Sequence, residues 1–301
     1  MLQQGPVIAA LLRAARGAAL SAFRGGRGPM PLLPGPEDFA IVPPLPASLV
    51  ADYLRHLGSD RAAYPGQVPP HLFPQWLFPM QARSLEALPY PMHRVLNGGC
   101  RMQIQAPLPL GEPLEVRARL EGIEEDERRA VLRLRASTGP ASAPRSLITD
   151  LYAIVPLRRA AASAAGKRER KPRPRVPEGV RELARWQLDS KAGLDFAKLT
   201  GDFNPIHWIP AYARVSGFSN VILHGSATLA RAYEGLARAL LAGDPTPLSF
   251  LDARFVRPLI LPASVGLYVR GREAWVGDGP GGPAYLEARF ALRSEREGVT
   301  A

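Results

Sequence analysis

A chain of 301 residues is long enough for about two domains, and a hydrophobic content of 46% can supply a large buried core. The single cysteine, Cys100, excludes an intrachain disulfide framework and a thiolate-rich zinc site, and it fits a reducing compartment such as the cytoplasm. We expect Cys100 to be a small buried side chain and not a nucleophile. The formal net charge of +11 favours anionic partners, and no run of about 18 uncharged apolar residues predicts a transmembrane helix.

Residues 1–36 form a predicted N-terminal extension. The first 27 residues contain four arginines, and no acidic residue precedes Glu37. An arginine-rich segment without acids is typical of an organellar transit peptide, which would place the protein in an organellar matrix. An amphipathic helix lying on another surface and an extension from an early start codon fit the same composition.

Residues 37–159 are predicted to form the first domain. Its pattern favours a helix over Leu49–Leu57, followed by strands over about 101–106, 114–122, 130–136 and 146–155. Between them lies the aromatic and proline-rich stretch Phe73–Met80, which could either line a pocket or fill the core. Helices followed by runs of strands predict an α+β arrangement and not alternating βαβ units.

Residues 160–177 form a predicted linker. Within it, prolines alternate with like charges from Lys167 to Arg175, a composition that stays extended and solvated. Such a basic run could contact nucleic acid, but no aromatic residue is interleaved to stack on bases. We therefore expect a linker and no nucleic-acid partner.

Residues 178–301 are predicted to form the second domain. After a short helix over Leu194–Leu199, an alanine-rich helix runs from Gly225 to Leu240, with apolar residues recurring every three or four positions and Arg231, Glu234 and Arg238 on other faces. Strands are predicted over about 248–256, 265–273 and 284–293. The alanines keep the helix thin enough for a sheet to wrap around it.

The two domains have similar sequence patterns. Pro107 and Pro258 lie 151 positions apart, each followed by a strand-like segment, and a helix-like segment precedes each of them. The recurrence predicts a duplicated domain.

The chemistry-bearing residues lie in the second domain. Asp202 and His207 are five positions apart across a turn that contains Pro205. The segment could be an ordinary loop, since Gly, Asp, Asn and Pro are frequent turn formers. However, a carboxylate and an imidazole so placed could both contact one water molecule and exchange its protons.

A second candidate part of the site lies at His224–Gly225, where the alanine-rich helix begins. The first N–H groups of a helix have no intrahelical partners, and glycine lets a ligand approach the backbone closely. With the helix dipole they form a site for the oxyanion that develops on a thioester carbonyl. We expect His224 itself to be structural.

The ordered set Asp202, Asn204, Pro205, His207, Pro210, Ala213, Gly217, Phe218, His224 and Gly225 resembles the signature of the MaoC-like (R)-specific enoyl-thioester hydratases. The resemblance covers roughly residues 186–293. It implies that Asp202 and His207 activate water, that the Gly225 N–H polarises the thioester carbonyl, and that Asn204 either shapes the site or hydrogen-bonds within it. It also implies an α+β double hot-dog, in which two antiparallel sheets, each wrapped around a central helix, join into one pseudo-dimeric unit. Two positions depart from the pattern: Ile209 stands where many members have an acid, and Ala230 where some have a small hydroxyl residue.

The first domain carries no equivalent pair. Asp60 lies where the repeat would place the aspartate, but Pro65 is found five positions on, and His71 is out of register. We expect the first domain to be a copy without catalytic residues. We also expect it to have lost its paired helix, which would leave room for a longer acyl chain.

The predicted activity is hydration of an enoyl thioester, or dehydration of a 3-hydroxyacyl thioester, without metal or cofactor. A hot-dog thioesterase and a non-catalytic acyl-thioester binding scaffold are the alternatives. The positive charge suits either the phosphates of CoA or an acidic acyl-carrier protein. A duplicated chain already supplies two hot-dog domains, so both a monomer and a homodimer are compatible with it.

Overall fold

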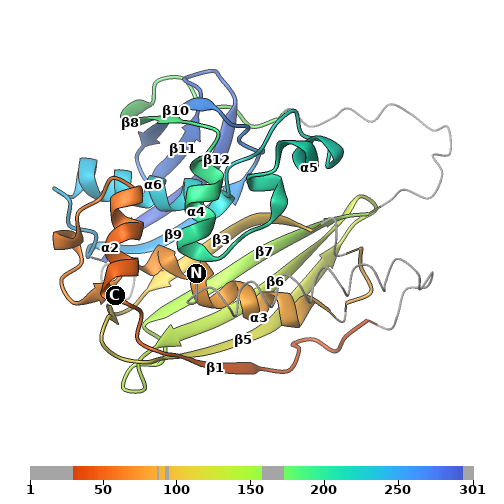
Figure 1. Ribbon diagram of the computed structural model, residues 1–301, viewed down its shortest axis with the longest axis vertical. Coiled ribbons are helices and arrows are strands. Elements are labelled where there is room, and N and C mark those ends of the chain that lie inside the picture. Colours follow the sequence, from red (N-terminus) through yellow and green to blue (C-terminus); the bar gives the residue numbers. More distant parts are fainter. Residues whose placement is uncertain (1–29, 87, 92–94, 158–172, 294–301) are drawn as a thin grey trace.

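Ten strands pair into one antiparallel sheet in the order β1-β5-β6-β7-β3-β9-β12-β11-β10-β8 (Figure 1). The computed structural model describes residues 30–86, 88–91, 95–157 and 173–293. The first five strands of the sheet come from the N-terminal half: β1 (Asp38–Val42), β3 (Leu96–Ile104), β5 (Leu114–Glu125), β6 (Arg129–Gly139) and β7 (Leu147–Pro156). The other five come from the C-terminal half: β8 (Arg181–Leu188), β9 (Leu248–Phe255), β10 (Ala263–Arg270), β11 (Glu273–Gly277) and β12 (Ala284–Leu292). The short strands β2 (Gln67–Val68) and β4 (Leu108–Pro109) pair separately.

The strand order supports the predicted duplication. Numbered within its own half, each set of five strands follows the same order, first-third-fourth-fifth-second, counted from the outer edge of the sheet. The two second strands, β3 and β9, meet in the middle and make the two half-sheets continuous. At this seam Gly99 has a φ of 138°, and a Cβ there would lie 2.2 Å from the carbonyl oxygen of Ala253, so the close pairing requires glycine.

The helices are α2 (Ala47–His56), α3 (Pro74–Glu86), α4 (Ala192–Thr200), α5 (Pro210–Val215) and α6 (Gly225–Leu240), with the 3₁₀ turns η2 (Arg61–Ala63), η3 (Pro70–Leu72) and η5 (Pro205–His207). Helices α3 and α6 lie against this sheet, while α2 packs on α4 and α5 on the turn η5 (Figure 1). Helix α6 packs against β8, β9 and β12 of its own half and β3 of the other, as expected for a central hot-dog helix.

The N-terminal half keeps a helix on its sheet, so the expected loss of that helix is wrong. Helix α3 packs on β1 and β5 and contains most of the stretch 73–80. Its residues Trp76, Leu77 and Met80 are at most 4% exposed and fill the core. Sequence periodicity missed α3 because proline and aromatic residues interrupt the pattern of a surface helix.

Three sheet strands were also missed: β1, β8 and β11. The predicted strand 265–273 runs past the end of β10, where Gly271 adopts a φ of 59° and turns the chain into β11. A left-handed residue cannot continue a strand, so the predicted strand corresponds to β10 and extends too far into the turn before β11.

The predicted extension and linker fall mainly outside the described residues, which begin at Met30 and omit residues 158–172. Of the linker, residues 173–177 are described, and Val176 is buried and donates its N–H to the carbonyl of Gly282. This end of the segment is therefore anchored on the C-terminal half through Val176, while Arg173 and Arg175 are exposed. Within the described residues, no helix combines the length and the apolar character needed to cross a membrane.

Helix α6 is buried on all sides from Ser226 to Ala237. This includes Arg231 and Glu234, which are 6% and 3% exposed, whereas Arg238 is exposed. The faces that carry Arg231 and Glu234 are therefore buried as well as the apolar face. The helical period identified one apolar face, but the N-terminal half packs on the polar face as well.

Candidate active site

The loop that carries Asp202 is shaped by its own backbone. Helix α4 ends at Gly201, whose φ of 81° turns the chain away from the helix. The Asp202 carboxylate then accepts the N–H of Asn204 at 3.3 Å, and the Asn204 side-chain oxygen accepts the N–H of Ile206 at 3.3 Å. Asn204 therefore caps the turn η5, which ends at His207. It shapes the loop through this cap, which is one of the two roles expected for it.

The His207 ring is held in one orientation. Its Nδ1 lies 2.8 Å from the carbonyl oxygen of Ile222, and the N–H of Ile222 donates back to the carbonyl of Ile206. A carbonyl only accepts, so Nδ1 carries the proton, and Nε2 keeps its lone pair. Burial lowers the pKa of His207, while Asp202 and the Ile222 carbonyl oppose that shift. The imidazole is therefore neutral near pH 7 and can accept a proton at Nε2.

His224 belongs to the same cluster. Its ring stacks on His207 with a centroid distance of 3.6 Å and an interplanar angle of 24°. Its Nε2 lies 2.9 Å from the carbonyl oxygen of Asp202 and 3.8 Å from a carboxylate oxygen of that residue. The expected structural role thus becomes specific: His224 holds the Asp202 backbone and one face of the His207 ring.

The structure brings the predicted pair together. One side-chain nitrogen or oxygen each of Asp202, His207 and His224 lies within 4.8 Å of the others. Each histidine has one nitrogen bound to a backbone carbonyl, so each ring has one nitrogen left that can exchange a proton or bind an ion. The cluster therefore combines a carboxylate with two imidazoles, and the same three residues are the ones that could hold a metal ion.

Gly225 begins α6 immediately beside this cluster. It is partly exposed, whereas the four residues before it are buried. A Cβ at this position would lie 2.5 Å from the Phe255 ring, so only glycine allows β9 to pack against the start of the helix. The first N–H groups of α6 therefore stand next to the Asp202–His207 pair and can polarise a carbonyl oxygen placed there.

Gly193, in α4, was missed by the sequence reasoning. A Cβ on it would lie 2.1 Å from the carbonyl oxygen of His207, so α4 and the loop that carries Asp202 and His207 touch backbone to backbone. A lone glycine near the start of a helix gives no sequence signal for such a contact.

We expect Gly193→Ala to reduce enoyl-thioester hydration by about 10²-fold, because the methyl group must displace the backbone of His207 and a shift of about 1 Å at a catalytic group can cost that much. Steady-state kinetics with crotonyl-CoA measure the loss. Gly111→Ala is the matched control, since no atom lies within 4 Å of a Cβ placed there. Equal activity in the two variants would contradict the assigned contact.

The acid side of the pH profile is expected to report His207. Because burial lowers its pKa, the folded protein binds this proton less readily than the unfolded chain, whose histidines titrate near about 6.5. Stability and activity should both be intact at pH 7 and fall as the pH drops below about 6.5. The pH dependence of kcat/KM and of the melting temperature tests this. An acid limb centred above pH 7 would contradict it.

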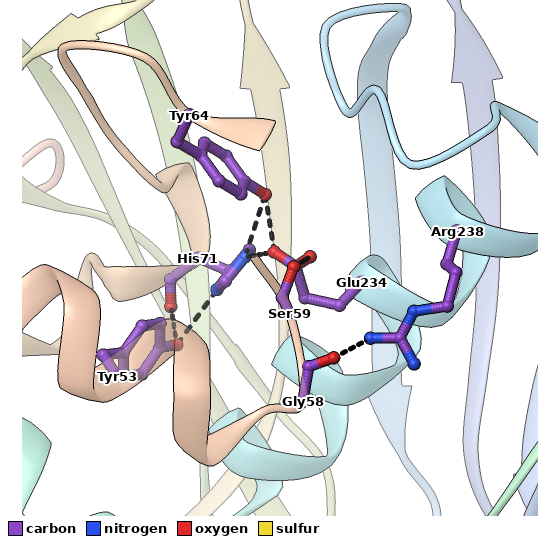
Figure 2. A network of polar contacts seen from close by, with 7 residues as sticks. All are labelled: Tyr53, Gly58, Ser59, Tyr64, His71, Glu234 and Arg238. Atoms are coloured by element: carbon purple, nitrogen blue, oxygen red, sulfur yellow. Dashed lines mark hydrogen bonds and ion pairs between the residues drawn. The ribbon is translucent and has the colours of Figure 1, made fainter. Parts of the chain in front are cut away.

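The candidate residues of the N-terminal half, Asp60 and His71, each have other partners. Asp60 accepts the N–H of Ala62 and caps η2. His71 is fully buried, and its Nε2 lies 2.7 Å from a carboxylate oxygen of Glu234 on α6 (Figure 2). His71 thus joins the two halves and does not form a second proton-transfer site.

Comparison with known proteins defines the class. The structure of HtdX from Mycobacterium tuberculosis superposes with a TM-score of 0.66 and 21% identity, covering 85% of this chain and 99% of that one. A further Mycobacterium tuberculosis protein, described as having a double hotdog fold, superposes with a TM-score of 0.54 and 18% identity, covering 87% and 96%. The chain is a double hot-dog.

The family model described as "MaoC like domain" matches residues 168–275. The 3-hydroxyacyl-thioester dehydratase X of Mycobacterium tuberculosis is 29% identical over 172 residues, 56% of this chain and 57% of the relative. The enoyl-CoA hydratase ChsH3 of the same organism is 30% identical over 166 residues, 54% and 56% of the two chains. These matches span little more than half the length of either relative. The chain carries a MaoC-like dehydratase domain.

Proposed function

We propose that this protein catalyses the reversible addition of water to an enoyl thioester, which in the other direction is the dehydration of an (R)-3-hydroxyacyl thioester. Three observations support the proposal: the MaoC-like domain, the hydratase and dehydratase names of its relatives, and the approach of Asp202 and His207 at the start of α6. The observation that carries it is the His207 ring, whose Nδ1 is bound to Ile222 so that Nε2 keeps a lone pair beside the Asp202 carboxylate.

The reaction can be written on these groups. A water molecule held between the Asp202 carboxylate and His207 Nε2 gives one proton to this pair while its oxygen bonds to the β-carbon of the substrate. The electron pair of the double bond moves to the thioester, whose oxygen becomes enolate-like and is stabilised by the N–H of Gly225. A proton from the same pair then reaches the α-carbon. Hydroxyl and hydrogen have been added across the double bond, and Asp202 and His207 return to their starting state.

The carrier of the acyl group is proposed to be CoA or an acyl-carrier protein. The net charge of +11 suits the phosphates of CoA and an acidic carrier surface alike. The carrier preference can be measured by comparing the same acyl group on the two carriers.

The experiment follows the conjugated enoyl absorbance of crotonyl-CoA on addition of the full chain. Loss of this absorbance without thiol release is the expected result. Release of free CoA would favour a thioesterase, and tight binding without any turnover would favour a non-catalytic acyl-thioester scaffold. Either outcome would overturn the proposal.

A further inference from the structure

Arg231, in the middle of α6, is a buried cation without an acidic partner. It is 6% exposed, and within the described part of the chain its guanidinium contacts the carbonyl oxygen of Ala227 at 3.4 Å and His56 Nε2 at 3.1 Å, with no carboxylate in an ion pair. Burial lowers its pKa to about 10, so it still carries its charge near pH 7. Burial and Arg231 together lower the pKa of His56 to about 4, so this neighbour is neutral.

The nearest acid on the same helix does not neutralise Arg231. The Glu234 carboxylate accepts hydrogen bonds from Ser59 and Tyr64 and contacts His71 (Figure 2), and it forms no ion pair with Arg231 among the described residues. An unpaired buried charge is costly, and proteins usually pair such groups or use them to bind a ligand. The missing counter-ion therefore points to a ligand.

Arg231 lies close to the candidate active site. It is seven positions after His224, so both side chains lie on the same side of α6, two turns apart. The guanidinium reaches back to Ala227, only two residues after Gly225, a rise of about 3 Å along the helix axis. The Phe196 ring, which is itself fully buried, contacts both His224 and His56, with centroid distances of 5.1 Å and 6.2 Å.

We propose that Arg231, with His56 beside it, binds a carboxylate on the acyl chain of the substrate, so that the protein acts on thioesters of short dicarboxylic acids. The assignment rests on the proposed hydratase function. A planar guanidinium can hold a carboxylate through two parallel hydrogen bonds, and in a partly dry site these bonds are strong. Gly225 and His56 are both partly exposed, so both ends of this segment can be reached from solvent.

The position of Arg231 favours an acyl carboxylate over a phosphate of the carrier. The thioester carbonyl is expected at the N–H of Gly225, and the guanidinium lies within about one helical turn of it. This separation suits the far end of a four- or five-carbon acyl chain. The phosphates of CoA or of an acyl-carrier protein lie at the other end of the long pantetheine arm.

A binding experiment tests the subsite without requiring turnover. Glutaryl-CoA and hexanoyl-CoA share the carrier and differ in the terminal carboxylate, and calorimetry gives their affinities for the wild type, Arg231→Gln and Arg231→Lys. We expect the wild type to bind glutaryl-CoA at least about tenfold more tightly, the Gln variant to lose this preference, and the Lys variant to keep part of it. If the Arg231 variants bind glutaryl-CoA and hexanoyl-CoA equally more weakly than the wild type, Arg231 contacts the carrier arm or supports folding. If the wild type itself binds the two ligands equally well, the carboxylate subsite is overturned, and this result does not depend on whether the variants fold.

Kinetics separate this inference from the proposed function. With glutaconyl-CoA as the carboxylate-bearing enoyl substrate, Arg231→Gln should lower the ratio of kcat/KM for glutaconyl-CoA to kcat/KM for crotonyl-CoA at least about tenfold. Hydration of crotonyl-CoA without a carboxylate preference would refute the subsite alone. Carboxylate-dependent binding without hydration of either substrate would refute the proposed function alone.

Discussion

Asp202→Asn is expected to lower the rate of crotonyl-CoA hydration by about 10²- to 10⁴-fold, the usual contribution of a positioned acid–base group. The amide has nearly the shape of the carboxylate and can still accept the N–H of Asn204, so the loop should keep its form. It cannot take the proton of the attacking water. Steady-state kinetics give the loss, and the circular dichroism spectrum and melting temperature should stay close to those of the wild type.

Asp189→Asn is the matched control for this substitution. Asp189 accepts the N–H of Lys191 in the turn before α4, much as Asp202 accepts the N–H of Asn204, but it is exposed and outside the cluster. Its activity should equal that of the wild type. Comparable activity of the Asp202 and Asp189 variants would remove Asp202 from the mechanism.

The second large effect is expected from the buried contact between His71 and Glu234. Burial raises the pKa of Glu234, but the hydrogen bonds from His71, Ser59 and Tyr64 outweigh it and hold the pKa below the usual value, so the carboxylate is ionised near pH 7. Replacing His71 with Leu removes a main partner of this charge. Breaking a buried pair from one side typically costs about 3–5 kcal/mol, and urea denaturation should show a loss of this size in the free energy of unfolding.

A double-substituted chain distinguishes lost pairing from lost packing. Adding Glu234→Gln to His71→Leu removes the carboxylate charge that the His71 substitution leaves without its partner. The loss in the free energy of unfolding of the double variant should therefore be smaller than the sum of the losses of the two single variants. Arg55→Gln, which breaks the exposed pair with Asp52, should change stability little. Strict additivity of the His71 and Glu234 losses would show that the two side chains are not coupled.

The two halves of the molecule contribute different residues to the surroundings of α6. The C-terminal half supplies the loop that carries Asp202 and His207, whereas the N-terminal half supplies side chains that cover the polar face of the helix. The Tyr53 hydroxyl of α2 contacts His71, which in turn contacts Glu234 of α6 (Figure 2), and His56 of α2 contacts Arg231 of α6. A half without an acid–base pair thus remains essential to the surroundings of the site.

Local sequence determined the features that depend on neighbours along the chain. The spacing of Asp202, Asn204 and His207 predicted one polar loop because a turn fixes the relative positions of residues a few places apart. The period of apolar residues located α6 with its observed bounds, Gly225–Leu240, because a regular helix needs only local hydrogen bonds. Cys100 is buried as expected, and burial raises the pKa of its thiol.

Tertiary structure decided the features that depend on contacts between distant segments. His71 and Glu234 are 163 positions apart, and the arginine that lacks a carboxylate can be recognised only once every neighbour is in place. The stacking of His224 on His207 and the backbone contact at Gly193 arise in the same way. Periodicity shows which side of a helix is apolar, but whether its polar side meets water or another segment depends on how the whole chain packs.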